Sequence, residues 1–311
     1  MLVSILITSY NYSRYLGIAI DSALNQTYQD IEVIVVDDGP TDESPAVIAS
    51  YGERIVSRVK ENGGPTSALN QAFEISRGQL ICLLDADDVF EATKVQSVVD
   101  AASDVPGAYL VHHQLQMIDA DGRPLNAPFP RRVSSGDLRS RVRQSGGWFP
   151  HAVSSGLAFR RSYAERLFPI PDSWDVKIGS ESHRVALGAD TYLAGPAALL
   201  APVAGIDRPL TRYRTHQSNR STRFFEVPAV QLVRYAAEME ALSTAMREKF
   251  GQPVHLQLDQ HLDYQLLRCA AGDASRARTV GRVLRSAVLP LGQRCREALR
   301  VCANRGPARR L

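Results

Sequence analysis

Residues 79–88 read Gln-Leu-Ile-Cys-Leu-Leu-Asp-Ala-Asp-Asp: five consecutive apolar side chains, then three carboxylates within four positions. An apolar run of this length predicts a strand buried on both faces. Carboxylates repel one another and are costly to bury, so a cluster at the end of such a strand needs a partner. A hard cation such as Mg²⁺ or Mn²⁺ is the usual one, and phosphates complete its shell. The alternative is a solvated acidic turn in which Asp88 caps the following segment.

The rest of the first hundred residues alternates between short apolar runs and amphipathic stretches. The apolar runs predict strands at Leu2–Thr8, Ile31–Val36, Arg54–Lys60 and Gln79–Leu84. The stretches between them predict helices at Ser13–Asn25, Thr41–Tyr51 (with Thr41 as the cap) and Thr66–Ser76. Because strand and helix alternate, we expect an α/β fold with a Rossmann-like, mostly parallel central sheet flanked by helices.

Polar side chains follow three of these predicted strands. They form the clusters Thr8–Asn11, Asp37–Asp38 and Asp85–Asp88. In open α/β sheets, ligands bind beyond the carboxyl ends of the strands. The three clusters are therefore expected to share one ligand site.

The sequence beyond residue 100 is less regular. It predicts a strand at Gly107–Asp119, a Pro-, Gly- and Ser-rich stretch to about Pro150, and a late strand at Ile206–Tyr213. From about Val227 to the end the pattern is helical.

Several of these segments together carry a resemblance to a known family. They are Leu6-Ile7-Thr8-Ser9-Tyr10-Asn11, Val35-Val36-Asp37-Asp38-Gly39-Pro40-Thr41-Asp42, Asn62-Gly63-Gly64, Asn70 and Leu83-Leu84-Asp85-Ala86-Asp87-Asp88. In this order and spacing they resemble the family 2 inverting glycosyltransferases of the GT-A fold. Pro40 stands where the family usually has serine.

The resemblance also divides the chain. It is clear over residues 1–100 and recognisable to about residue 221. It therefore implies a GT-A domain at 1–221, with a nucleotide-binding half at 1–100 and an acceptor and catalytic half at 101–221. Residues 222–311 are then a helical, basic C-terminal extension.

The resemblance implies roles for residues at the three strand ends. Thr8 and Tyr10 would line the pocket of the nucleotide base. Asp38 would accept a hydrogen bond from the base imide, which favours uracil or thymine. Asp85 would meet the ribose, and Asp87 would coordinate a metal that bridges the diphosphate. Taken singly, each residue could instead be a strand-end cap or a packing residue.

Inverting transfer also needs a general base for the acceptor hydroxyl. The family usually supplies an Asp preceded by Glu, about two dozen residues before a Tyr-Arg-x-His element. That element is Tyr213-Arg214-Thr215-His216, and counting back reaches Asp190, which follows Ala189 instead of Glu. The alternative carboxylates are Asp172, Asp175 and Glu181. Asp190 could also simply cap the next helix.

The resemblance assigns the remaining polar residues as follows. Arg214 and His216 would face the diphosphate, with His216 a candidate metal ligand or else a surface histidine. Ser154-Ser155-Gly156 and Arg160-Arg161 resemble the segment near the acceptor. Trp148 and His151 lie just before it, and Trp148 could stack on a sugar or pack in the core.

The charge of the chain is unevenly distributed. The net charge is +3, but from Arg268 onward eleven arginines stand against Asp273 and Glu297. The segment Val280–Val301 reads as a basic amphipathic helix, which is typical of a helix that lies on an anionic membrane surface. A solvated helix packed on the body is the alternative. No motif or aromatic interleaving indicates binding to nucleic acid.

Composition and cysteine usage suggest a compartment. The chain has 44% hydrophobic and 22% charged residues, as globular domains do. The four cysteines show no metal-type spacing, and the apolar N-terminus is too short for a signal peptide. We expect a cytoplasmic protein that binds peripherally to the inner face of the membrane.

These inferences converge on one expected activity. It is the metal-dependent transfer of a sugar from a nucleotide-diphosphate sugar to a glycan or lipid-linked acceptor, in polysaccharide or cell-envelope biosynthesis. A nucleotide-sugar-binding protein without catalysis is the alternative, favoured by Ala189. A Rossmann dehydrogenase is excluded, because no Gly-x-Gly-x-x-Gly follows the first strand.

Overall fold

The computed structural model describes residues 1–125, 127–145, 147, 149–178, 181–186, 188–216, 228–254 and 256. The strands are β1 (Val3–Ser9), β2 (Ile31–Asp38), β3 (Val56–Lys60), β4 (Leu80–Asp85), β5 (Val89–Phe90), β6 (Leu110–Ile118), β7 (Leu157–Arg160), β8 (Trp174–Ile178), β9 (Glu181–Val185) and β10 (Val203–Arg214). The α-helices are α1 (Ser13–Leu24), α2 (Ser44–Ala49), α3 (Pro65–Ile75), α4 (Lys94–Asp104), α5 (Arg139–Gln144), α6 (Arg161–Ala164), α7 (Ala189–Leu200) and α9 (Pro228–Phe250). Two short 3₁₀ turns, η1 (Gly52–Arg54) and η2 (Ser154–Gly156), complete the described elements.

One central sheet organises the molecule. Its strands lie in the order β3-β2-β1-β4-β7-β6-β10-β5. The first four are parallel to one another, as the alternation of strand and helix predicts. β7 is antiparallel to both β4 and β6, and β5 is antiparallel to β10. Parallel β6 and β10 therefore point the same way as β4, which brings the end of β10 to the edge where the acidic cluster lies.

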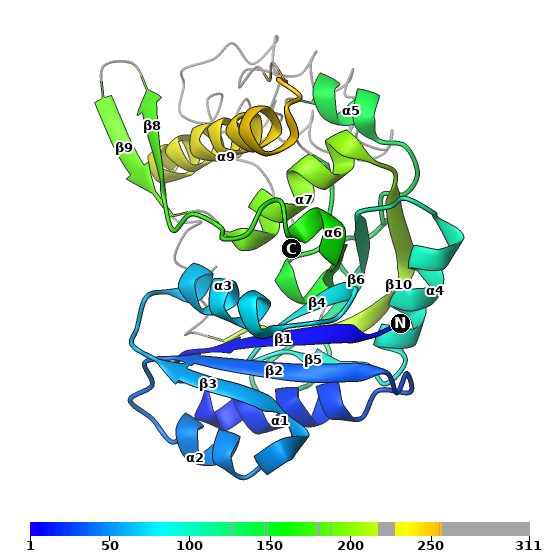
Figure 1. Ribbon diagram of the computed structural model, residues 1–311, viewed down its shortest axis with the longest axis vertical. Helices are drawn as coiled ribbons and strands as arrows, with labels where there is room; N and C mark the ends of the chain where they lie inside the picture. The colour runs from blue at the N-terminus through cyan, green and yellow to red at the C-terminus, as the bar shows by residue number, and fades with distance from the viewer. Residues whose placement is uncertain are drawn as a thin grey trace.

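The two faces of the sheet are covered by different helices. On β1, Ile5 and Ile7 belong to a core shared with α1, α2 and α4, whereas Leu6 belongs to a core shared with α3, α7 and α9. Figure 1 shows α3 on one side of β1 and both α1 and α2 on the other. Because successive side chains of a strand point to opposite faces, a continuous apolar run is what a doubly covered strand requires.

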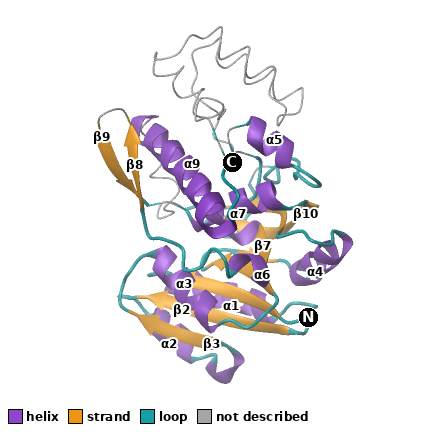
Figure 2. Cartoon of the chain, turned by 45° about the horizontal axis from the view of Figure 1, so that its top comes forward, coloured by secondary structure: helices purple, strands orange, loops and turns teal. Residues whose placement is uncertain are grey.

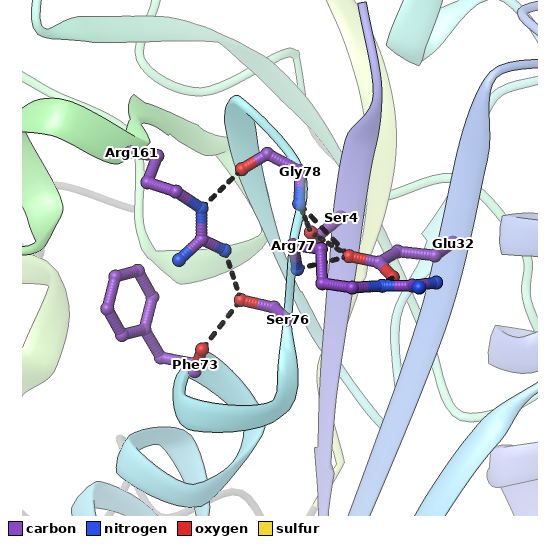
Figure 3. A network of polar contacts seen from close by, with 7 residues as sticks. All are labelled: Ser4, Glu32, Phe73, Ser76, Arg77, Gly78 and Arg161. Carbon is purple, nitrogen blue, oxygen red and sulfur yellow. Dashed lines mark hydrogen bonds and ion pairs between the residues drawn. The ribbon is translucent and has the colours of Figure 1, made fainter.

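The amino-terminal edge of the sheet is closed by a polar network around Glu32 (Figure 3). Its carboxylate accepts hydrogen bonds from the Ser4 hydroxyl at 2.6 Å and the Gly78 amide at 3.0 Å. Burial alone would raise the pKa of Glu32, but these bonds and those from Arg77 lower it. On the other side, Arg161 donates to the Gly78 carbonyl at 2.6 Å. The network thus joins β1, β2 and α6 to the turn before β4.

The acceptor half contains a hairpin that the sequence pattern did not indicate. β8 and β9 pair antiparallel, from Trp174 opposite Val185 to Ile178 opposite Glu181. Figure 2 shows this hairpin beside α9 and away from the central sheet. The strands β5 and β7 were also missed, because two and four residues give too little periodicity to detect.

The start of α2 also differs from the expectation. Thr41 does not cap it: the Thr41 amide donates to Asn11 Oδ1 at 2.7 Å, and the helix begins at Ser44. Pro45 in the first turn suits this later start, because proline needs no hydrogen-bond partner there. Among the described helices, none combines the length and the apolar character needed to span a bilayer.

Candidate functional site

The three polar clusters lie side by side at the carboxyl edge of the sheet. Thr8 of β1 is in register with Asp85 of β4, and Ser9 is in register with Asp37 of β2. Parallel pairing of these strands produces the juxtaposition, because it brings their carboxyl ends to one edge. The structure therefore unites the predicted residues Thr8, Asp38 and Asp85 with the rest of the acidic cluster.

His216 completes the acidic cluster from the far end of the chain. Its Nε2 lies 3.0 Å from Asp87 Oδ2, and both side chains are about one-tenth exposed. β10 runs parallel to β6 and ends at Arg214, which carries His216 to the carboxyl edge. Asp87 and His216 are the two residues predicted to bind a metal. The structure places their side chains in contact with each other.

Two carboxylates of the cluster, those of Asp85 and Asp88, hold protons more tightly than isolated ones. Burial, and then the charges of Asp87 and Asp190, raise the pKa of Asp85 to about 7. Burial and the charges of Asp87 and Asp85 likewise hold the pKa of Asp88 well above its ordinary value. Such a cluster gains from a positive charge placed among its members.

Asp190 reaches this cluster from another element. It lies in the first turn of α7, and its Oδ1 accepts a hydrogen bond from the Thr191 amide at 2.9 Å. The charge of Asp190 contributes to the raised pKa of Asp85, so the two carboxylates lie within electrostatic range of each other although they are far apart in sequence.

Arg214 contacts the backbone around the acidic cluster. Its guanidinium donates to the carbonyls of Asp87 at 2.8 Å and Ala120 at 3.1 Å, and its amide donates to Asp88 Oδ1 at 2.8 Å. The residue is only 4% exposed. These contacts shape the turn that carries Asp87 and Asp88. The expected contact of Arg214 with a diphosphate stays a prediction.

The site is more open around Tyr10, which is predicted to line the pocket of the nucleotide base. Tyr10 is 47% exposed, so one face of its ring is available to a ligand. Asn11 adopts a left-handed conformation (φ 58°), and its side chain accepts the Thr41 amide. This bond fixes the turn that presents Tyr10.

Asp38 is buried and already engaged. Its Oδ1 accepts bonds from Lys60 Nζ at 2.7 Å and the Gly63 amide at 2.9 Å, and Oδ2 accepts the Gly64 amide at 2.6 Å. A carboxylate can accept about four hydrogen bonds, so one more is possible. Gly39 (φ 73°) permits this arrangement, since a Cβ there would lie 2.6 Å from the Asn62 amide.

The residues present suit a small divalent cation. Among the described residues, no three His, Cys, Asp or Glu side chains converge on one point. Mg²⁺-type sites, however, commonly use one or two protein ligands and leave the remaining positions to water and phosphate. Neighbouring ligands of an octahedral ion with bonds of about 2.1 Å are about 3.0 Å apart. Asp87 Oδ2 and His216 Nε2 have this separation.

Two functional contacts could not be found from the sequence. The Ser155 hydroxyl accepts the Asp85 amide at 3.0 Å, and a hydrogen bond with Ser155 also lowers the pKa of Asp88. Tyr12 lies close enough that burial and then the charges of Asp87 and Asp85 raise the pKa of its phenol. In the sequence, the segment Ser154-Ser155-Gly156 indicated a place near the acceptor for Ser155, and nothing indicated a role for Tyr12.

Other motif residues have structural contacts or lie outside the described part. Asn70 exchanges two hydrogen bonds with the backbone of Ile170, at 2.7 and 2.8 Å, and so ties α3 to the acceptor half. His151 packs against Phe149, with ring centroids 5.0 Å apart. Trp148 and the extension from residue 257 onward, including Val280–Val301, lie outside the described residues.

Comparison with known sequences gives a family match. The family model described as glycosyl transferase family 2 matches residues 4–168. An uncharacterized glycosyltransferase of Nostoc sp. (strain PCC 7120) is 32% identical over 276 residues, which are 85% of this chain and 81% of that protein. The chondroitin synthase of Pasteurella multocida is 44% identical over 98 residues, 30% of this chain and only 10% of that protein. An uncharacterized glycosyltransferase of Rickettsia prowazekii is 46% identical over 99 residues, 32% of this chain and 31% of its own length.

Solved structures share the fold. Residues 1–349 of S. aureus TarS, in complex with UDP-GlcNAc, superpose with a TM-score of 0.55 at 15% identity, covering 97% of this chain and 89% of that one. The mannosyltransferase PcManGT of Pyrobaculum calidifontis, in complex with GDP-Man and Mn²⁺, gives 0.51 at 17% identity, covering 97% and 86%. At these identities the likeness establishes the GT-A fold. With the family match over half of the chain and the Nostoc relative over most of it, the chain belongs to glycosyltransferase family 2.

Proposed function

We propose that this glycosyltransferase transfers one sugar, with inversion and with the help of a divalent cation, from a UDP- or dTDP-linked donor to a glycan or lipid-linked acceptor. The observation that carries the proposal is the contact of Asp87 with His216 at the edge where β1, β2 and β4 end, with Asp190 in electrostatic range of Asp85. Three distant parts of the sequence supply these groups. Each has chemistry that the transfer of a sugar requires.

The donor would lie along the carboxyl edge of the sheet. In this proposal the base lies against Tyr10 and donates its imide N–H to Asp38, the ribose meets Asp85, and Thr8 lines the base pocket. The diphosphate then lies toward Asp87 and His216. The solved structures with this fold hold UDP-GlcNAc and GDP-Man, which supports a nucleotide-sugar donor.

Asp87 and His216 are proposed to hold Mg²⁺ or Mn²⁺, and PcManGT holds Mn²⁺. A bound cation would stabilise the negative charge that develops on the departing nucleotide diphosphate. Asp88 and Arg214 keep the ligand-bearing turn in place through the bond from the Arg214 amide to Asp88 Oδ1.

Asp190 is proposed as the general base. Its carboxylate would take the proton of the acceptor hydroxyl while that oxygen attacks the anomeric carbon from the face opposite the leaving diphosphate. The new glycosidic bond forms as the bond to the diphosphate breaks, which inverts the anomeric centre. Asp190 lies at the start of α7 and its charge acts on Asp85, which supports this role over Asp172, Asp175 and Glu181.

The decisive experiment measures nucleotide diphosphate release from a panel of nucleotide sugars with Mn²⁺ and oligosaccharide or lipid-linked acceptors. We expect Asp190→Asn to lower the rate of transfer by about 10²–10⁴-fold, as loss of a general base does, while donor affinity measured by thermal shift stays unchanged. Asp175→Asn is the matched control and should retain activity.

Two outcomes would favour other readings. Transfer that survives in Asp190→Asn and fails in Asp175→Asn would move the base to Asp175. If wild-type protein binds nucleotide sugars but releases no nucleotide diphosphate from any of them, the alternative of a binding protein without catalysis gains. The replacement of the usual Glu by Ala189 is the feature that favours this alternative.

A further inference from the structure

Two tyrosines at the start of α1 contact the histidine of the acidic cluster. Tyr12 is the N-cap of α1, and its carbonyl accepts the amides of Tyr15 and Leu16, each at 2.9 Å. Residues three positions apart lie on the same face of a helix. Tyr12 and Tyr15 therefore project together, and the face they share is turned toward His216.

The imidazole of His216 is held between these rings. Its centroid is 5.8 Å from that of Tyr12 with an interplanar angle of 71°, an edge-to-face contact. It is 5.4 Å from that of Tyr15 with an angle of 34°. Aromatic pairs at centroid separations of about 4.5–7 Å attract one another in addition to the effect of the area they bury.

His216 needs such support because regular structure ends before it. β10 stops at Arg214. The next residue, Thr215, still donates its amide to the Ile118 carbonyl at 2.9 Å. The Arg214 guanidinium lies 4.6 Å above the ring of Tyr15, so the aromatic pair supports both functional side chains of this segment. The imidazole also contacts Asp87 through its Nε2 atom, at 3.0 Å.

We propose that Tyr12 is a positioning residue, whose ring holds the imidazole of His216 against Asp87 and so keeps the two protein ligands of the cation site together. The cation part of this inference rests on the proposed function. Tyr12 contacts the imidazole through its aromatic ring, so phenylalanine preserves the role and alanine removes it. The Tyr12 side chain makes no capping hydrogen bond, so Tyr12→Ala leaves the start of α1 intact.

The first test needs neither metal nor donor. Diethyl pyrocarbonate modifies accessible neutral imidazoles, and peptide mass mapping locates the modified histidines. In the metal-free protein we expect His216 to react severalfold faster in Tyr12→Ala than in wild type or Tyr12→Phe. His151 and His183 should react at unchanged rates and serve as internal references. Equal rates at His216 in all three proteins would overturn the contact.

The second test measures Mn²⁺ affinity by calorimetry. Loss of a residue that orients a metal ligand typically weakens metal binding by about 10–100-fold. We expect Tyr12→Ala to weaken Mn²⁺ binding by about tenfold and Tyr12→Phe to weaken it by less than about twofold. Tyr28→Ala is the matched control, because the Tyr28 hydroxyl bonds to the amine and carbonyl of Met1, at the opposite end of β1 from the acidic cluster.

A double-mutant cycle decides whether Tyr12 acts through His216. In the His216→Ala background, Tyr12→Ala should cause no further loss of Mn²⁺ affinity, because the group that it positions is gone. An equal further loss would overturn the inference. If wild type binds no Mn²⁺ at all, the metal part of the proposed function fails, and the modification rates still decide whether Tyr12 holds His216.

Discussion

Asp87 is the residue on which the electrostatics of the site converge. It raises the pKa of Asp85, Asp88 and Tyr12, and its carboxylate contacts His216. A carboxylate that lies beside an imidazole nitrogen is a suitable ligand for a cation.

We therefore expect Asp87→Ala to abolish Mn²⁺-dependent binding of UDP. The reason is that the variant removes one of two protein ligands and half of the Asp87–His216 pair. Calorimetric titration of UDP with and without Mn²⁺ measures the effect. Unchanged affinity in the presence of Mn²⁺ would count against the metal role. Glu53→Ala, at an exposed carboxylate of η1, is the control.

Asp37 lies at the same edge of the sheet, where its protonation affects the stability of the fold. The residue is completely buried at the end of β2, and burial raises its pKa to about 6, with contributions from the charges of Asp42 and Asp38. The folded state therefore binds a proton more tightly than the unfolded state, whose value is near 3.8. Ionisation of this carboxylate must then cost stability as the pH rises.

The sign of the effect gives a test. As the pH rises from about 4 to about 6, the folded protein should lose up to about 1.4 kcal/mol of unfolding free energy per pH unit through Asp37. Asp37→Asn removes this loss, so the difference in stability between variant and wild type should grow over that window and level off above pH 7. Urea unfolding at a series of pH values measures it. A constant difference would refute the assignment, and Glu53→Gln is the surface control.

At the scale of the elements, α3 and β4 are joined by a turn that approaches β1 very closely. A Cβ on Gly78 would lie 2.4 Å from the Ser4 amide nitrogen and 2.5 Å from its hydroxyl. Gly17, in α1, is the opposite case: a Cβ there would meet the Tyr51 hydroxyl at 3.5 Å and Val47 Cγ1 at 3.7 Å, both ordinary contacts. The same substitution should therefore have opposite effects at the two sites.

We expect Gly78→Ala to lower the free energy of unfolding by about 1–3 kcal/mol, because β1 or the turn must shift. Gly17→Ala should raise it by about 0.5–1 kcal/mol, because alanine is the better helix former. Thermal and urea unfolding measure both changes. Equal effects of the same sign would show that neither site behaves as the packing indicates.

At the scale of the whole molecule, the site is assembled from segments up to about two hundred residues apart. Asp87 and His216 meet although 129 positions separate them. Asp190 is brought in by α7, and Asn70 ties α3 to the backbone of Ile170. Residues 1–100 and residues 101–221 thus each contribute side chains to the candidate site.

The basic extension supplies a prediction for the whole chain. We expect the full-length protein to sediment with liposomes of anionic phospholipid at low salt, and a chain truncated after Leu267 to stay in the supernatant. High salt should release the full-length protein, because the attraction is screened. A full-length variant with Arg282, Arg285, Arg294, Arg296 and Arg300 changed to Gln separates charge from truncation. Equal sedimentation of all three proteins contradicts membrane binding through this segment.

The sequence by itself determined the family and the layered α/β architecture of the first hundred residues. Apolar runs that alternate with amphipathic stretches have few other solutions, and the observed ends of β1, β2 and β4 lie within two residues of the expected ones. The polar clusters at those ends were readable because parallel pairing is regular. The roles of all the predicted site residues remain predictions: Thr8, Tyr10, Asp38 and Asp85 for the nucleotide, Asp87 and His216 for the metal, Arg214 for the diphosphate and Asp190 as the base.

Only the tertiary structure decided how the cluster is completed. The antiparallel β7, the short β5 and the β8–β9 hairpin depend on long-range pairing that no local pattern encodes. The contacts of Tyr12 with His216 and of Ser155 with the Asp85 amide join residues from separate elements. Such contacts follow from the way elements pack, whereas periodicity in a sequence reports only which face of each element is buried.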